Sequence, residues 1–198
     1  MNGSSTFRRV FHILSPAFLS YFILPDQVGG GIAKASLAIL FVGTAWCIEI
    51  ARIALGINLF GMRPYEGGRV SAYAQGTLGL AIGIFLIRQP AIVVPVFLGM
   101  AWIDPLAASV RRGEWPRAIV GLAYFGLFLG TELLLPVPWP PSWSFLLAAV
   151  AMAVALVVEG PKHKLLDDDF LMQVVPYAVL YGIALAFLSN AVRWPPWA

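Results

Sequence analysis

Three adjacent aspartates, Asp167, Asp168 and Asp169, have the residue type and spacing to bind a metal ion. They lie in a short polar stretch, together with Glu159 and Lys162, between two long apolar runs. Adjacent carboxylates repel one another and raise each other's pKa unless they share a cation. Because Mg²⁺ prefers carboxylate and phosphate oxygens, we expect Asp167 and Asp168 to bind Mg²⁺, with Glu159 and Lys162 near the phosphates. The alternative is a solvated loop between two helices.

Asp104 is a charged residue inside the fourth long apolar run. An ionised aspartate at the centre of a bilayer costs about 2.5 to 3.5 kcal/mol, so such a residue usually faces a cavity, a partner or a metal ion. We expect Asp104 to act in catalysis and to bind the metal ion. One alternative is a carboxylate that bonds to a neighbouring helix. Another is the proton or cation site of a small ion-coupled transporter.

Three arginines lie where they could bind phosphate. Arg9 is near the amino terminus, Arg52 is near the end of the second apolar run, and Arg69 lies in the loop that follows. A guanidinium group matches two phosphate oxygens at once. These arginines are therefore predicted to bind a nucleoside triphosphate or a lipid phosphate. The alternative is contact with the anionic lipids of the inner leaflet.

Three residues are candidates for a general base: His12, Glu49 and Glu66. A general base takes the proton from an attacking hydroxyl, and imidazole and carboxylate groups can both do this. Glu49 lies three residues before Arg52 on one face of a predicted helix, so these two side chains could instead pair with each other. The sequence does not choose among the three candidates.

The composition is that of a polytopic integral membrane protein. Of the 198 residues, 60% are hydrophobic and 12% are charged, with a mean hydropathy of +0.82, whereas soluble domains have about 25% charged residues. A transmembrane helix needs about 20 mostly apolar residues, and Pro and Gly mark the breaks between such runs. We predict a single all-α transmembrane domain, residues 1–198. Its seven predicted helices are residues 8–25, 32–55, 71–88, 90–110, 117–136, 142–158 and 173–192.

The basic residues predict the orientation, because cytoplasmic loops are enriched in Lys and Arg. With seven spans, ten of the thirteen basic residues fall on one side: Arg8, Arg9, Arg52, Arg63, Arg69, Arg111, Arg112, Arg117, Lys162 and Lys164. The other side receives three: Lys34, Arg88 and Arg193. The amino terminus is therefore predicted to be cytoplasmic. The aspartate triplet falls on the same side, so the predicted active site in the cell membrane faces the cytoplasm.

Several motifs of soluble enzymes are missing from the sequence. It has no G-x-x-x-x-G-K-[ST] loop for phosphates, no H-E-x-x-H and no C-x-x-C, which argues against a soluble-type kinase or a cysteine-based metal site. Its single cysteine, Cys47, excludes a disulfide within the chain. We expect no nucleic-acid partner, and the sequence leaves the oligomeric state open.

The candidate residues form five short motifs that follow one another along the chain. They are Arg8-Arg9-Val10-Phe11-His12, Glu49-Ile50-Ala51-Arg52, the loop Arg63 to Arg69, Ile103-Asp104-Pro105-Leu106-Ala107 and Asp167-Asp168-Asp169-Phe170-Leu171. In this order they resemble the motifs of the CTP-dependent lipid kinases, the family of dolichol kinase, phytol kinase and the CTP-dependent diacylglycerol kinase. That family is related to the membrane cytidylyltransferases that make CDP-lipids.

One segment departs from the family pattern. The family's K-[ST]-x-E-G-[ST] would fall on residues 117–122, where Arg117 replaces the lysine and Val120 replaces the glutamate. Because that segment belongs to the family's nucleotide site, the chain resembles a divergent member. Glu159 is a hypothetical substitute for the missing carboxylate.

The resemblance implies an activity and its cofactors. It implies transfer of a phosphoryl group from CTP to a polyprenol-like or other lipid alcohol at the cytosolic membrane face, with Mg²⁺ held by Asp104, Asp167 and Asp168. The alternatives are a cytidylyltransferase that makes a CDP-lipid, a small ion-coupled transporter, and an inactive membrane interaction protein.

Overall fold

The computed structural model describes residues 3–63, 66–159 and 166–188, apart from the side chains at 4, 5, 104, 105, 108, 111 and 117. The prediction of an all-α protein is confirmed for these residues. The helices are α1 (Gly3–Leu14), α2 (Lys34–Leu55), α3 (Ala72–Ala81), α4 (Pro90–Arg111), α5 (Arg117–Leu134), α6 (Pro141–Val158) and α7 (Asp168–Phe187). A 3₁₀ helix, η1 (Ser15–Phe22), continues α1, and a π-helix, η3 (Ile82–Ile87), continues α3. Two short antiparallel strands, β1 (Gln27–Val28) and β2 (Ile32–Ala33), connect η1 to α2.

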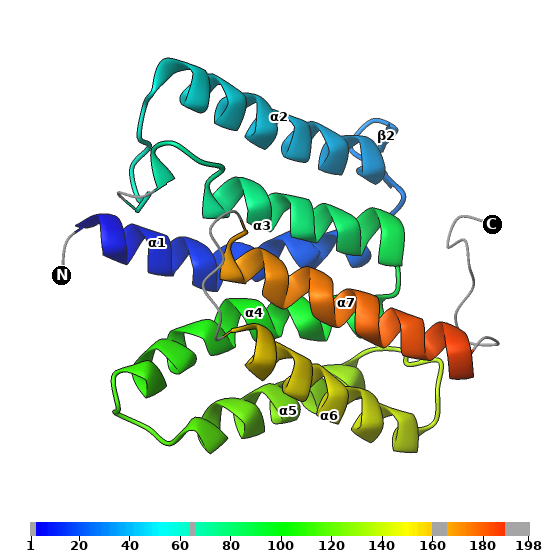
Figure 1. Ribbon diagram of the computed structural model, residues 1–198. Coiled ribbons are helices and arrows are strands. Elements are labelled where there is room, and N and C mark those ends of the chain that lie inside the picture. Colours follow the sequence, from blue (N-terminus) through cyan, green and yellow to red (C-terminus); the bar gives the residue numbers. More distant parts are fainter. Residues whose placement is uncertain (1–2, 64–65, 160–165, 189–198) are drawn as a thin grey trace.

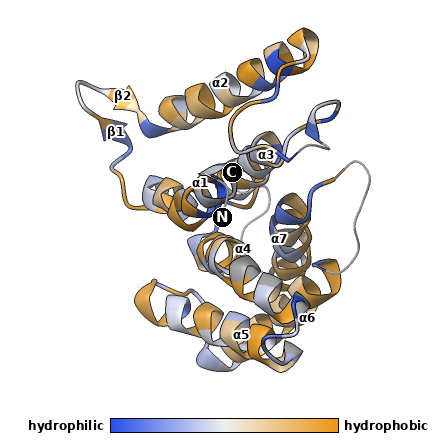
Figure 2. Ribbon diagram, turned by 90° about the vertical axis from the view of Figure 1, so that its left-hand side faces the viewer, coloured by the Kyte–Doolittle hydropathy of each residue, from blue (hydrophilic) through white to orange (hydrophobic). Residues whose placement is uncertain are grey.

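Successive helices run in opposite directions, so their ends collect at two ends of the bundle (Figure 1). The starts of α1, α3 and α7 lie at the same end as the last turns of α2, α4 and α6. Figure 2 looks onto this end and shows hydrophilic segments near the end of α2, in the loop before α3 and at the start of α7. Helices far apart in the sequence therefore bring their polar termini together.

Three helices of the described residues, α2, α6 and α7, are long and apolar enough to cross a membrane, judged by length and composition. Shorter apolar helical stretches cover residues 72–87, 90–103 and 118–134. Helix α2 lies at the edge of the bundle, where its main helical neighbour is α3. Its outer face exposes large apolar side chains such as Ile39 and Leu40, as a lipid-facing helix would.

Helix α4 is at the centre of the core and packs against α1, α5 and α7. Its residues Ile92, Val93 and Val96 are fully buried. Gly99 lies where α4 meets α5, and a Cβ added there would overlap the ring of Tyr124, which is itself buried. The missing side chain at Gly99 therefore sets how closely α4 and α5 approach.

Gly99→Ala is expected to lower the free energy of unfolding by about 1 to 3 kcal/mol, because overpacking a buried contact shifts side chains and backbone. Equilibrium unfolding of the purified protein in detergent micelles measures this loss. Gly126→Ala on α5 is the matched control, because a Cβ at Gly126 meets no atom within 4 Å. Equal stability of the two variants would contradict the proposed contact.

Helix α7 starts earlier than its predicted start at residue 173, so the predicted position of the aspartate triplet in a loop is wrong. The Asp167 side chain accepts a hydrogen bond from the backbone N–H of Asp169 at 3.2 Å, which is the contact of a helix N-cap. Asp168 and Asp169 occupy the first turn, where the helix dipole favours negative charge. The triplet therefore begins the helix.

Two glycines, Gly79 on α3 and Gly83 on η3, allow α7 to pack closely against these two helices. A Cβ at Gly79 would lie 2.7 Å from the Gln173 Oε1 atom, and one at Gly83 would lie 3.2 Å from the Tyr177 ring. Gln173 and Tyr177 are both fully buried. This close packing of small residues, common between membrane helices, places α7 beside α3 and η3.

Candidate functional site

A cavity of about 540 Å³, its open mouth included, lies among α1, η1, α3, α4 and α7. One part of its wall is polar, and the rest is mostly apolar and aromatic. The polar side chains include Arg8, His12, Tyr73, Asp169 and Gln173. The apolar ones include Phe11, Phe18, Leu80, Phe97 and Met100. A cavity with one polar and one apolar part suits an amphiphilic ligand.

His12 is held between α4 and α7. Its Nε2 atom lies 3.1 Å from the carbonyl oxygen of Met100, and since a carbonyl can only accept, Nε2 carries a proton. Its Nδ1 atom lies 3.8 Å from Asp169 Oδ2, which is beyond direct hydrogen-bond distance. In a neutral ring, Nδ1 is then the nitrogen with a free electron pair, and it faces the carboxylate in the cavity.

The aspartates at the start of α7 form a cluster beside this cavity. One carboxylate oxygen from each of Asp167, Asp168 and Asp169 lies within 4.8 Å of the others. Burial and the neighbouring charge of Asp168 raise the pKa of Asp167 to about 7. Arg63 Nη1, 3.7 Å from Asp167 Oδ2, opposes that rise. A bound cation would stabilise the ionised carboxylates.

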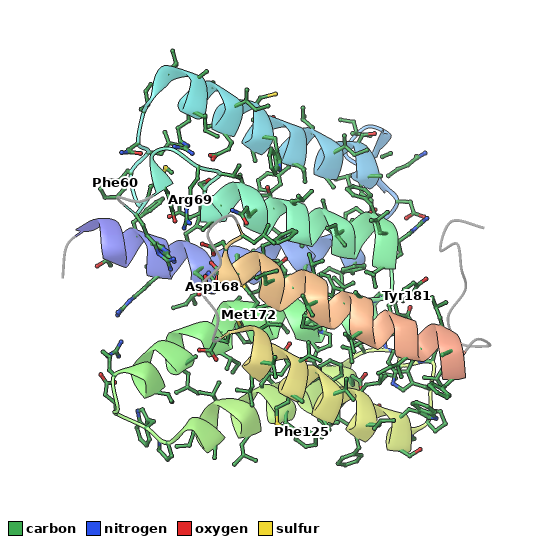
Figure 3. The ribbon with its side chains drawn as sticks, viewed as in Figure 1. Phe60, Arg69, Phe125, Asp168, Met172 and Tyr181 are labelled. Carbon is green, nitrogen blue, oxygen red and sulfur yellow. The ribbon has the colours of Figure 1, made fainter. Side chains whose placement is uncertain are left out.

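Backbone contacts fix this cluster relative to α3. The backbone N–H of Asp167 donates to Gln75 Oε1 at 2.7 Å, and the Gln75 side chain donates from Nε2 to the carbonyl of Val70 at 3.1 Å. Figure 3 shows Asp168 and Arg69 at the same end of the bundle, with Tyr181 farther along α7. The cluster is therefore attached to the polar end of the bundle.

Glu49 and Arg52 form the pair that their three-residue spacing suggested. Arg52 donates to both carboxylate oxygens of Glu49, from Nη2 at 2.7 Å and from Nε at 3.0 Å. Ser71 donates to the same carboxylate from its backbone N–H at 2.6 Å and its hydroxyl at 2.9 Å. Arg52 also donates to the carbonyl oxygen of Arg69 at 2.6 Å. These buried contacts attach the loop before α3 to the last turns of α2.

Glu66 lies buried in that loop. Its Oε2 atom accepts a hydrogen bond from the backbone N–H of Arg63 at 3.2 Å, and its Oε1 atom has no hydrogen-bond partner among the described residues. Burial raises the pKa of Glu66, and the positive charges of Arg63, Arg69 and Arg52 act in the opposite direction. Glu66 thus lies close to three arginines.

None of the remaining predicted site residues is among those that line the cavity in the described part of the chain. Arg9 is exposed and is not among the residues that line the cavity, whereas its neighbour Arg8 is. Glu159 follows the last turn of α6. The backbone of Asp104 belongs to α4, but its side chain lies outside the described part of the chain, and so does all of Lys162.

The sequence interpretation missed Arg8, Tyr73 and Gln173 as cavity residues, and it missed the proximity of His12 to Asp169. Two spacings pointed to part of this result. Arg8 and His12 lie four residues apart, as do Asp169 and Gln173, and residues at that spacing share a helix face. Tyr73 gave no such signal.

No protein-family model, curated protein or solved structure matches this chain. The function is therefore argued from the cavity itself. It combines an apolar wall, the imidazole of His12 and the carboxylate of Asp169, which belongs to the aspartate cluster.

Proposed function

We propose that this protein is a membrane phosphotransferase that moves a phosphoryl group from a nucleoside triphosphate to a lipid alcohol. The observation that carries the proposal is the cavity in which His12 and Asp169 meet an apolar wall. A lipid alcohol has a hydroxyl to place beside the imidazole and a hydrocarbon chain to place against Phe11, Phe97 and Met100. The resemblance of the motifs makes CTP the expected donor.

In this proposal His12 is the general base. The substrate hydroxyl gives its proton to His12 Nδ1, and its oxygen attacks the γ-phosphorus of the nucleotide. The bond between that phosphorus and the bridging oxygen breaks, so the nucleoside diphosphate leaves with the bond's electron pair. The Asp169 carboxylate, 3.8 Å from the Nδ1 atom that receives the proton, stabilises the imidazolium by charge attraction, and His12 then releases the proton to water.

The aspartates suit a magnesium ion. Their carboxylates lie within 4.8 Å of one another, and Asp167 and Asp168 would hold the ion, with Asp169 at the edge of the cluster. We keep Asp104 as a proposed ligand of the same ion, because it belongs to α4 and α4 packs against α7. Magnesium, when bound, neutralises charge on the phosphates of the donor.

The arginines at this end of the bundle would bind the triphosphate. Arg8 lines the cavity, and Arg63 lies 3.7 Å from Asp167. Arg69 lies in the loop before α3, where its carbonyl oxygen accepts a hydrogen bond from Arg52. We assign the buried pair of Glu49 and Arg52 to holding the loop, because the four hydrogen bonds that Glu49 accepts come from Arg52 and Ser71.

We further propose that seven segments cross the cell membrane and that the amino terminus is cytoplasmic. The alternating direction of the helices is that of consecutive membrane spans (Figure 1), and the ten-to-three distribution of basic residues favours a cytoplasmic amino terminus. The cavity mouth would then open toward cytosolic nucleotides.

The test is transfer from γ-radiolabelled nucleotides by the purified protein. CTP and ATP are each supplied with hexadecanol, geranylgeraniol or diacylglycerol, and the lipid phosphates are separated by chromatography. We expect a radiolabelled lipid phosphate that requires Mg²⁺. If no lipid gives product while an established lipid kinase works in parallel, the proposal fails. Release of pyrophosphate from CTP with phosphatidate would instead identify a cytidylyltransferase.

A further inference from the structure

A second hollow, here called the chain groove, lies between η1, α2 and the α3–η3 helix and encloses about 690 Å³ of space, its open side included. Nearly all of its lining is apolar, including Leu37, Ala38, Phe41, Val42 and Ile84. Phe18 and Leu80 line both this groove and the cavity that contains His12. These two side chains therefore lie between the two spaces, which are adjacent and are together called the combined space.

Charged or titratable side chains lie at both ends of this combined space. The cavity end has the imidazole of His12 and the carboxylate of Asp169. At the far end of the chain groove the charged side chain is Lys34, whose Nζ lies 3.1 Å from Asp26 and donates to the carbonyl of Leu24 at 3.0 Å. The same ammonium lies over the Tyr21 ring, 5.2 Å from its centroid. Asp26 already neutralises the Lys34 ammonium. The hydroxyl of a lipid alcohol is therefore favoured at the cavity end, beside His12 and Asp169.

The length of the combined space fits one hydrocarbon chain. From Tyr73 in the cavity to Ala81 at the end of α3, the helical rise of about 1.5 Å per residue gives about 12 Å, and η3 continues from there to Phe85 in the groove. Half of a bilayer's hydrocarbon core, which is about 30 Å thick, is about 15 Å. A chain that fills one leaflet would therefore extend through both spaces. Helix α2 forms one wall of the groove, and the opposite face of this helix is exposed and apolar.

We infer that the chain groove binds the hydrocarbon chain of the same lipid alcohol whose hydroxyl lies beside His12, so that one molecule extends from the cavity past Phe18 and Leu80 to Tyr21. The identity of the head group rests on the proposed phosphotransfer. Binding of a hydrocarbon chain in the groove can be detected whether or not the protein transfers a phosphoryl group. The site selects a long, single, flexible chain with a hydroxyl at one end.

Photolabelling of the full chain in lipid nanodiscs tests this inference. Two hexadecanol probes carry a diazirine, one at the carbon next to the hydroxyl-bearing carbon and one at the terminal carbon, and the labelled peptides are mapped by mass spectrometry. The head-end probe should label cavity residues such as Phe97 and Met100. The tail-end probe should label groove residues such as Phe41 and Ile84. The reverse assignment, or tail labelling confined to the outer face of α2, would overturn the inference.

Ala38→Trp places a large side chain in the groove, and Ile39→Trp places the same side chain on the exposed outer face of α2. Ala38→Trp should reduce tail-end labelling of the groove about tenfold, since each buried methylene adds several-fold to affinity. Ile39→Trp should leave that labelling unchanged. Equal labelling in both variants would overturn the inference. Groove labelling without any phosphoryl transfer would refute the proposed function and leave the chain groove supported.

Discussion

His12→Gln is expected to lower kcat for phosphoryl transfer by about 10²- to 10⁴-fold, the usual contribution of a positioned general base. The glutamine amide can still donate to the Met100 carbonyl that accepts from His12 at 3.1 Å, so the cavity keeps its shape. The amide has no basic nitrogen to take the hydroxyl proton. Initial rates over a range of lipid concentrations separate kcat from KM and show which of them changes.

The KM for the lipid alcohol should change little in His12→Gln, because the apolar wall that holds the chain is untouched. Glu114→Gln is the control, since Glu114 is exposed and pairs with Arg112 in the loop between α4 and α5. It should have the kcat of the unsubstituted protein. An unchanged kcat in His12→Gln would remove His12 from the role of base.

Arg52→Met is expected to lower the free energy of unfolding by about 3 to 5 kcal/mol, the usual cost of removing one partner from a buried ion pair. Glu49 is 3% exposed and Arg52 is 2% exposed. Without the guanidinium, Glu49 would remain a buried charge, and the loop before α3 would lose its hydrogen bonds to Arg52. Equilibrium unfolding in detergent micelles measures the difference.

Two variants show whether the loss comes from the unpaired carboxylate. Arg112→Met removes an arginine from an exposed ion pair with Glu114, and exposed pairs contribute little to stability, so this variant should unfold like the original protein. In the double variant Glu49→Gln and Arg52→Met, part of the lost stability should return, because no buried charge is left. A double variant that loses the sum of both single losses would argue against coupling of the pair.

Helix positions could be predicted from the sequence because apolar runs ended by Pro and Gly mark them directly. The second predicted helix, residues 32–55, agrees closely with α2. The first predicted helix, residues 8–25, divides into α1 and η1. Pro16 lies at the start of η1, and a proline has no N–H for the α-helical hydrogen bond. The pairing of Glu49 with Arg52 could also be predicted, because it depends on the spacing within one helix.

Contacts between helices could not be predicted in the same way. Whether Arg8 or Arg9 faces the cavity depends on how α1 rotates against α4, and a run of apolar residues on several sides of a helix does not define that rotation. The proximity of His12 to Asp169 depends on α1 and α7 both packing beside α4. The start of α7 at Asp168 depends on a cap formed by Asp167, which an apolar pattern does not include.

The central claim is that His12 and Asp169, from opposite ends of the chain, act as one unit in phosphoryl transfer. Its most direct test is a double-mutant cycle on kcat/KM with His12→Gln, Asp169→Asn and both substitutions together. Because residues that act as a unit are strongly non-additive, the double variant should be no slower than the slower single variant. A double variant that loses the product of the two single losses would show that the two side chains act separately and would contradict the account.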